Sequence, residues 1–78
     1  MKNTYEIDWI NETVYIDATT TTKGEPRTIT ISLNKLELAL KCTGSWTLYG
    51  KGKMYARGYI KDKQGKSLRI EMHRYLTD

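Results

Sequence analysis

Apolar and polar residues alternate with a period of two along most of this chain, and no other feature of the sequence constrains its fold as strongly. Such alternation is typical of a β-strand with one buried and one exposed face. It is clearest around Val14, Ile16 and Ala18. The pattern predicts strands over residues 4–10, 13–20, 27–33, 54–61 and 67–75, and the short stretch 45–49 is expected to add a sixth.

The segments between these strands contain turn residues and one helix signal. Asn11-Glu12 predicts a tight turn between the first two strands, and Asp62-Lys63-Gln64-Gly65 predicts the turn of a second hairpin. Asn34 followed by Glu37 forms a capping-box pattern, which predicts a short helix over about residues 35–42. We therefore expect an α+β fold with a small, mostly antiparallel sheet of about five to six strands and one short helix.

Length and composition limit the number of domains and the kinds of site. A chain of 78 residues is enough for one small hydrophobic core, so residues 1–78 are expected to form a single domain. Cys42 is the only cysteine and His73 the only histidine, so we expect no intramolecular disulfide, no metal site and no cofactor. No apolar run reaches the roughly 18 residues of a membrane span, and the N-terminus does not lead into a signal peptide. These features predict a cytoplasmic protein without a membrane partner.

Charge is distributed unevenly along the chain. The net charge is +4, yet residues 1–40 carry four cationic side chains and six carboxylates, whereas residues 41–78 carry nine cationic side chains and three carboxylates. A concentration of cations attracts nucleic acid or an acidic protein surface. The C-terminal half is therefore the predicted binding half.

Tyrosines and cations share one face of the predicted C-terminal hairpin. Rings interleaved with cationic groups are used by surfaces that bind single-stranded nucleic acid, because the rings stack on bases while the cations neutralise phosphate. The same charges suit an acidic protein partner, and such residues are also ordinary on a solvated strand, or the helix could cover them. The predicted binding residues are Tyr55, Arg57, Tyr59, Lys61 and Arg69 on the strands, with Lys51, Lys53, Lys63 and Lys66 in the adjoining loops.

The order of several short motifs in residues 27–77 is also informative. Ile29-Thr30-Ile31-Ser32 precedes a leucine-rich helix, Trp46 follows it, and a glycine-bearing turn separates Tyr55-Ala56-Arg57 from Met72-His73-Arg74-Tyr75-Leu76. This order resembles the β-rich segment that precedes the metal motif of phage HNH homing endonucleases. The resemblance implies a phage or prophage origin and an association with DNA.

The resemblance stops before the catalytic motif of that family. In those nucleases the His-Arg step is followed by an Asp-His pair and then by Asn and His, which bind metal and activate water. This sequence has no such residues after His73-Arg74, and His73 corresponds to a position before the motif. We therefore expect a non-catalytic protein.

Two further hypotheses concern protein partners. A compact, polarised chain without a catalytic set also suits a phage effector that binds and inhibits a host protein, for example one in transcription, replication, division or nuclease defence. An exposed edge strand, either 27–33 or 67–75, would allow two copies to pair as a homodimer across a two-fold axis. Nucleic-acid binding in the host bacterial cytoplasm is the leading hypothesis.

Overall fold

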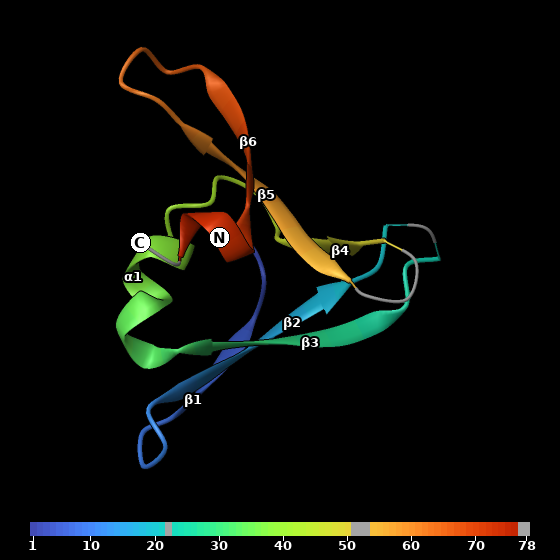
Figure 1. The fold of residues 1–78 in the computed structure, drawn as a ribbon, viewed down its shortest axis with the longest axis vertical. Helices are drawn as coiled ribbons and strands as arrows, with labels where there is room; N and C mark the ends of the chain where they lie inside the picture. The colour runs from blue at the N-terminus through green and yellow to red at the C-terminus, as the bar shows by residue number, and fades with distance from the viewer. Residues whose placement is uncertain (22, 51–53, 77–78) are drawn as a thin grey trace.

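The chain folds into two small antiparallel sheets with short helices packed between them (Figure 1). The computed structural model describes residues 1–21, 23–50 and 54–76. One sheet has the order β1 (Tyr5–Asp8), β2 (Thr13–Thr19), β3 (Pro26–Ser32), and the other has the order β4 (Thr47–Tyr49), β5 (Tyr55–Lys61), β6 (Ser67–Glu71). The 3-10 helix η1 (Leu33–Lys35) and the helix α1 (Leu36–Ala39) connect the sheets, and α2 (Met72–Tyr75) follows β6. The predicted α+β class is confirmed, with the six strands divided between two sheets.

The first sheet buries the alternate residues that the sequence pattern indicates. Val14 lies opposite Ile31, and Ile16 lies opposite Ile29. Both β2 residues have no exposed surface, because their pairs on β3 and the second sheet cover them. The polar residues between them face away from the core, as the period of a half-buried strand requires.

The second sheet turns its tyrosine-bearing face outward. Ala56 and Gly58 are buried, whereas Tyr59 on the other side of β5 is exposed. Gly58 lies beneath Trp46 and Cys42, which belong to the core. The tyrosine side of β5 is therefore its outer side, where His73 of α2 lies against Tyr55. The orientation left open by the sequence is settled by the contact of Gly58 with the core.

Trp46 and Asn3 join the N-terminal segment to both sheets. Trp46 is fully buried, and its indole nitrogen donates to the carbonyl of Ala39 at 3.1 Å. The Asn3 side chain accepts from the Trp46 backbone nitrogen at 2.7 Å and donates to the Trp46 carbonyl at 3.0 Å. Its amide also donates to the Asp17 carbonyl on β2 at 2.9 Å. One amide side chain thus spans the start of β4 and the middle of the first sheet.

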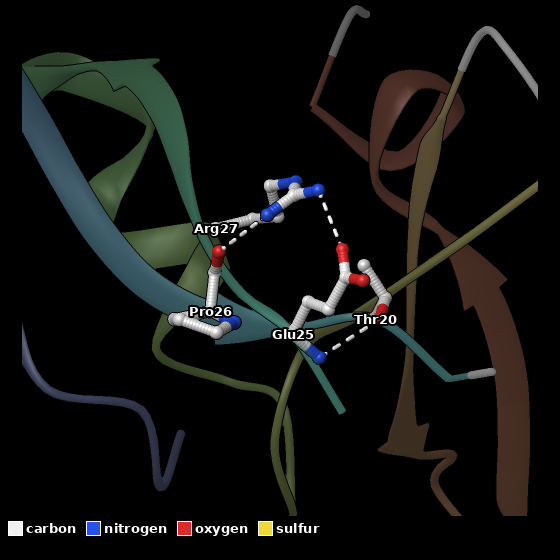
Figure 2. A network of polar contacts seen from close by, with 4 residues as sticks. All are labelled: Thr20, Glu25, Pro26 and Arg27. Carbon is white, nitrogen blue, oxygen red and sulfur yellow. Dashed lines mark hydrogen bonds and ion pairs between the residues drawn. The ribbon is translucent and has the colours of Figure 1, made fainter. Parts of the chain in front are cut away.

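The two sheets also meet directly where β2 ends. Thr20 forms a parallel bridge with Leu48, and the Thr21 nitrogen donates to the Leu48 carbonyl at 2.8 Å. The hydroxyl of Thr20 accepts from the backbone nitrogen of Glu25 at 3.0 Å (Figure 2). Arg27 pairs with the Glu25 carboxylate at 2.7 Å in the same network, so this cation is already engaged within the loop.

The predicted helix over residues 35–42 is too long. The α-helical turn covers only Leu36–Ala39, preceded by η1, and neither element has a side-chain cap hydrogen bond. Asn34 lies inside η1 and is not the predicted cap. Beyond Ala39 the chain turns so that Cys42, which is 1% exposed, enters the core.

Two predicted strands are also too long. The first ends at Asp8, because Asp8 accepts hydrogen bonds from both nitrogens of Asn11 and closes a turn there; Trp9 is consequently exposed instead of buried. The last strand ends at Glu71. Continued alternation would place Arg74 on the buried side with Met72, whereas the helical turn α2 buries Met72 and Leu76, four residues apart, and leaves Arg74 exposed.

The close approach at Gly58 predicts the effect of a single methyl group. A Cβ atom there would lie 2.8 Å from Cε3 of Trp46 and 2.9 Å from Sγ of Cys42, both of which are held in the core. Gly58→Ala is therefore expected to lower the free energy of unfolding by about 1–3 kcal/mol. Chemical denaturation of the variant and the wild type measures this difference.

Gly44→Ala is the matched control, since a Cβ atom at Gly44 meets nothing within 4 Å. We expect its free energy of unfolding to stay within about 0.5 kcal/mol of the wild type. Equal stability of the two variants would contradict the packing of β5 against Trp46.

Candidate nucleic-acid interface

The outer face of the second sheet brings together the predicted binding residues of both hairpin strands. Tyr59 pairs with Arg69, Arg57 pairs with Glu71, and Lys61 pairs with Ser67 in the register of β5 and β6. Side chains on paired residues of neighbouring strands point to the same face. Tyr55, Arg57, Tyr59, Lys61 and Arg69 therefore lie on one surface, as the alternation predicts.

The half of this face next to β4 is an interconnected cluster. The Tyr49 hydroxyl donates to Oε1 of Glu71 at 2.5 Å, and the guanidinium carbon of Arg57 lies 4.4 Å from the centre of the Tyr49 ring. The Tyr55 ring lies 6.1 Å from the Tyr49 ring and 4.9 Å from the His73 ring. We call Tyr49, Tyr55, Arg57, Glu71 and His73 the tyrosine–arginine cluster.

The charge of this cluster is largely compensated from within. The hydrogen bond from Tyr49 holds the pKa of Glu71 below its ordinary value, and the nearby His73, Arg74 and Arg69 act in the same direction. The same hydrogen bond raises the pKa of Tyr49, whose phenol keeps its proton to donate it. Glu71 is therefore a carboxylate at neutral pH. The Tyr49 ring packs against one side of the Arg57 guanidinium, which leaves that cation less accessible to an external phosphate.

The other half of the face is exposed and cationic. Tyr59 is 48% exposed, and Lys61 and Arg69 are exposed beside it. In the part of the chain that the structure describes, no ion pair involves the cations of this half. We call this half the basic hairpin end, and it consists of Tyr59, Lys61, Lys63, Lys66 and Arg69.

The turn of the basic hairpin end is held by hydrogen bonds from backbone nitrogens to the Asp62 side chain. The Asp62 carboxylate accepts from the backbone nitrogens of Gln64 and Lys66, both at 2.9 Å. Gly65 has a φ of 81°, which glycine adopts without strain. Figure 1 shows this hairpin extending beyond the body of the molecule at one end of its long axis. The lysines are consequently presented on an ordered, accessible turn.

Sequence reasoning missed two residues that determine how this face is used. The Tyr49 ring packs against Arg57 and its hydroxyl donates to Glu71, but neither Tyr49 nor Glu71 was among the predicted binding residues. The alternation of Thr47 and Tyr49 was a usable signal, although only the register shows that Tyr49 lies opposite Tyr55. Lys51 and Lys53, which the sequence places among the binding residues, lie outside the described residues.

No group of three or more His, Cys, Asp or Glu side chains in residues 1–21, 23–50 and 54–76 is arranged to hold a metal ion. None of the described helices is long and apolar enough to cross a membrane. The proposed pairing strands, β3 and β6, are edge strands of their sheets, and their pairing between copies stays a prediction.

The link between Tyr49 and Glu71 predicts a pH-dependent contribution to stability. A carboxyl whose pKa is lowered on folding stabilises the fold above its ordinary pKa, and this effect is lost as the pH falls through the folded-state pKa. Tyr49→Phe removes the donor, so the Glu71 pKa should rise and the variant should lose stability near neutral pH. The loss should shrink in acid, where Glu71 is protonated in both proteins.

NMR titration of the Glu71 carboxyl and thermal denaturation across the pH range measure these two effects. Tyr15→Phe, an exposed tyrosine on β2, is the matched control and should leave the Glu71 titration unchanged. An identical Glu71 titration in Tyr49→Phe and the wild type would contradict the hydrogen bond.

Comparison with known proteins identifies no relative of this chain. No protein-family model, curated protein or solved structure matches the chain. The resemblance to the segment before the HNH motif therefore stays a prediction from the sequence.

Proposed function

We propose that this chain is a small, non-catalytic nucleic-acid-binding protein that uses the basic hairpin end as its contact surface. The observation that carries the proposal is the exposed group of Lys61, Lys63, Lys66 and Arg69 around Tyr59, with no ion pair to any described carboxylate. Phosphate neutralisation by such cations supplies affinity without reading sequence. A phage or prophage origin is part of the proposal and rests on the sequence resemblance alone.

The two halves of the face are expected to have different roles in binding. Arg57 is covered on one side by the Tyr49 ring and lies opposite Glu71, so it is a weaker phosphate ligand than Arg69. The tyrosine–arginine cluster instead stiffens the base of the hairpin. The exposed Tyr59 ring is the group placed to stack on an unpaired base between the cations.

Four cations at the basic hairpin end predict a measurable salt dependence. The logarithm of the association constant should fall against the logarithm of salt concentration with a slope of about −3 to −4. Lys61→Glu/Arg69→Glu should weaken binding at least about tenfold and reduce the steepness of the slope by about 2. Fluorescence-anisotropy titrations with single- and double-stranded oligonucleotides provide both quantities.

The control Lys2→Glu/Lys23→Glu makes the same change in net charge at two exposed lysines outside the second sheet. It should keep the wild-type slope and an affinity within about threefold at physiological ionic strength, where distant exposed charges are screened. Equal losses in the two double variants would show that net charge, and not this surface, determines binding.

The Tyr59 ring predicts a preference for single strands. Tyr59→Ala should reduce the affinity for a single-stranded oligonucleotide by about 1–3 kcal/mol and affect a duplex less, because duplex bases are already stacked. Tyr15→Ala removes a ring of similar exposure on the other sheet and should have no effect. The same titrations test both variants, and equal binding by all three proteins would rule out stacking at Tyr59.

An acidic surface of a host protein is the second candidate partner for the same face. Tyrosine and arginine are enriched in the centres of protein interfaces, and the tyrosine–arginine cluster has that composition. Binding to oligonucleotides is expected to fail in this case. A specific bacterial protein should then be retained from nuclease-treated lysate by the wild type and lost with Lys61→Glu/Arg69→Glu.

A further inference from the structure

The turn between β1 and β2 presents an apolar pair among carboxylates. Trp9 is 70% exposed and Ile10 is 94% exposed, although Trp46, the other tryptophan, is fully buried. Residues 5–13 contain three carboxylates and no lysine or arginine. The residues that line the surface hollow beside Glu12 include no cation either. We call this end of the molecule the acidic tip, and it consists of Glu6, Asp8, Trp9, Ile10 and Glu12.

The backbone of the acidic tip is held by hydrogen bonds. Asp8 accepts from the Asn11 backbone nitrogen at 3.2 Å and from the Asn11 side chain at 2.8 Å. The carbonyl of Glu12 accepts from the Leu33 nitrogen at 2.8 Å. A turn that is already ordered presents its side chains at a lower entropic cost on binding. The apolar pair is therefore suited to anchor a contact.

A second apolar pair lies on the inner side of the β5–β6 hairpin. Ile60 pairs with Leu68, so both side chains lie on the face opposite Tyr59, which is the face that Gly58 turns toward the core. The hairpin extends beyond that core (Figure 1), so Ile60 is only half-buried and Leu68 is 46% exposed. We call Ile60 and Leu68 the apolar underside.

Cations dominate the charge around the apolar underside. Residues 59–69 contain four lysines and arginines and one carboxylate, Asp62, which already accepts hydrogen bonds from two backbone nitrogens of the turn. β4 pairs with β5 only as far as Arg57, so the hairpin beyond that point is a two-stranded ribbon. The cations of its turn and outer face lie within a Debye length, about 8–10 Å, of the apolar underside.

The two hairpin ends thus have complementary properties. One is an apolar pair among carboxylates, and the other is an apolar pair among cations, which is the pairing that favours a specific contact. Figure 1 shows them at opposite ends of the long axis, whose extent is 38 Å. Charges pair when nitrogen and oxygen lie within about 4 Å. The two ends of one copy therefore cannot meet, whereas a second copy supplies the complementary end.

We propose that the acidic tip of one copy binds the apolar underside and the turn lysines, Lys63 and Lys66, of a second copy, so that the protein associates head to tail. The contact joins two different surfaces, and each added copy leaves one acidic tip and one basic hairpin end open. The assembly is therefore expected to grow with protein concentration. The contact forms without nucleic acid and does not depend on the proposed function.

Sedimentation velocity of the pure protein tests this association from about 1 µM to about 500 µM, the range in which weak contacts form and dissociate. The average mass of the wild type should rise with concentration. Raising the salt concentration from about 50 mM to about 500 mM should lower the average mass, because salt screens the attraction between exposed charges.

Two double variants each remove one side of the contact. Trp9→Ala/Ile10→Ser removes the apolar pair of the acidic tip, and Lys63→Glu/Lys66→Glu reverses the charge of the turn. Each should weaken association about tenfold or more.

Two controls match these variants. Met54→Ser changes a 39% exposed apolar residue outside both hairpin ends and should associate as the wild type does. Lys2→Glu/Lys23→Glu makes the same change in net charge as the turn variant and should also keep the wild-type association.

Mixing the two disabled variants identifies the surfaces. Trp9→Ala/Ile10→Ser retains an intact basic hairpin end and Lys63→Glu/Lys66→Glu retains an intact acidic tip. Their equimolar mixture should therefore form a discrete 1:1 dimer while each alone stays monomeric. The emission of Trp9 in the turn variant should shift to shorter wavelength in this mixture, because the ring leaves water. Thermal melts matching the wild type establish that each variant is folded.

Four outcomes would overturn the proposal. They are a wild type that stays monomeric at the highest concentration, association that survives Trp9→Ala/Ile10→Ser, equal losses in the turn variant and its charge-matched control, and a mixture that gives no dimer. None of them bears on the proposed function, because these experiments contain no nucleic acid.

Discussion

The burial of Trp46 against Gly58 is the contact on which the rest of the structure depends. The indole is fully buried in the core that the two sheets share, and it lies against Gly58 of β5. Gly58 allows the backbone of β5 to reach the ring, and Asn3 fixes the backbone of Trp46 relative to β2. This arrangement decides which face of β5 is buried. The tyrosines and cations of β5 face outward because the glycine side must face inward.

The functional surfaces follow from this arrangement of the core. Both sheets direct their apolar faces toward the core around Trp46. The turn end of each hairpin extends past this core (Figure 1). One end is cationic and carries Tyr59, and the other is acidic and carries Trp9. The charge asymmetry of the sequence thus becomes a separation along the long axis of a molecule whose principal extents are 38 × 29 × 22 Å.

Local patterns predicted the strands well where nothing interrupted them. The inward residues of β2 and β3, such as Val14 and Ile29, follow directly from alternation. Alternation failed at Trp9, where a side-chain hydrogen bond closes the turn early, and beyond Glu71, where the helical turn α2 buries Met72 and Leu76 and leaves Arg74 exposed. The sequence predicted that these residues share a face, but it did not predict how the face divides into two halves. The Tyr49 ring that packs against Arg57 comes from β4, and the sequence does not reveal the register of β4 with β5.

The position of the basic hairpin end beyond the core has a consequence for how this protein can change over time. Lys61, Lys63, Lys66 and Arg69 are exposed and contribute no side chain to the hydrophobic cluster around Trp46. Substitutions at exposed positions of this kind usually alter stability little. Recognition at this surface can therefore diverge between lineages while the scaffold stays the same, because these four cations are free to vary where Gly58, Trp46 and the turn residues Asp62 and Gly65 are not.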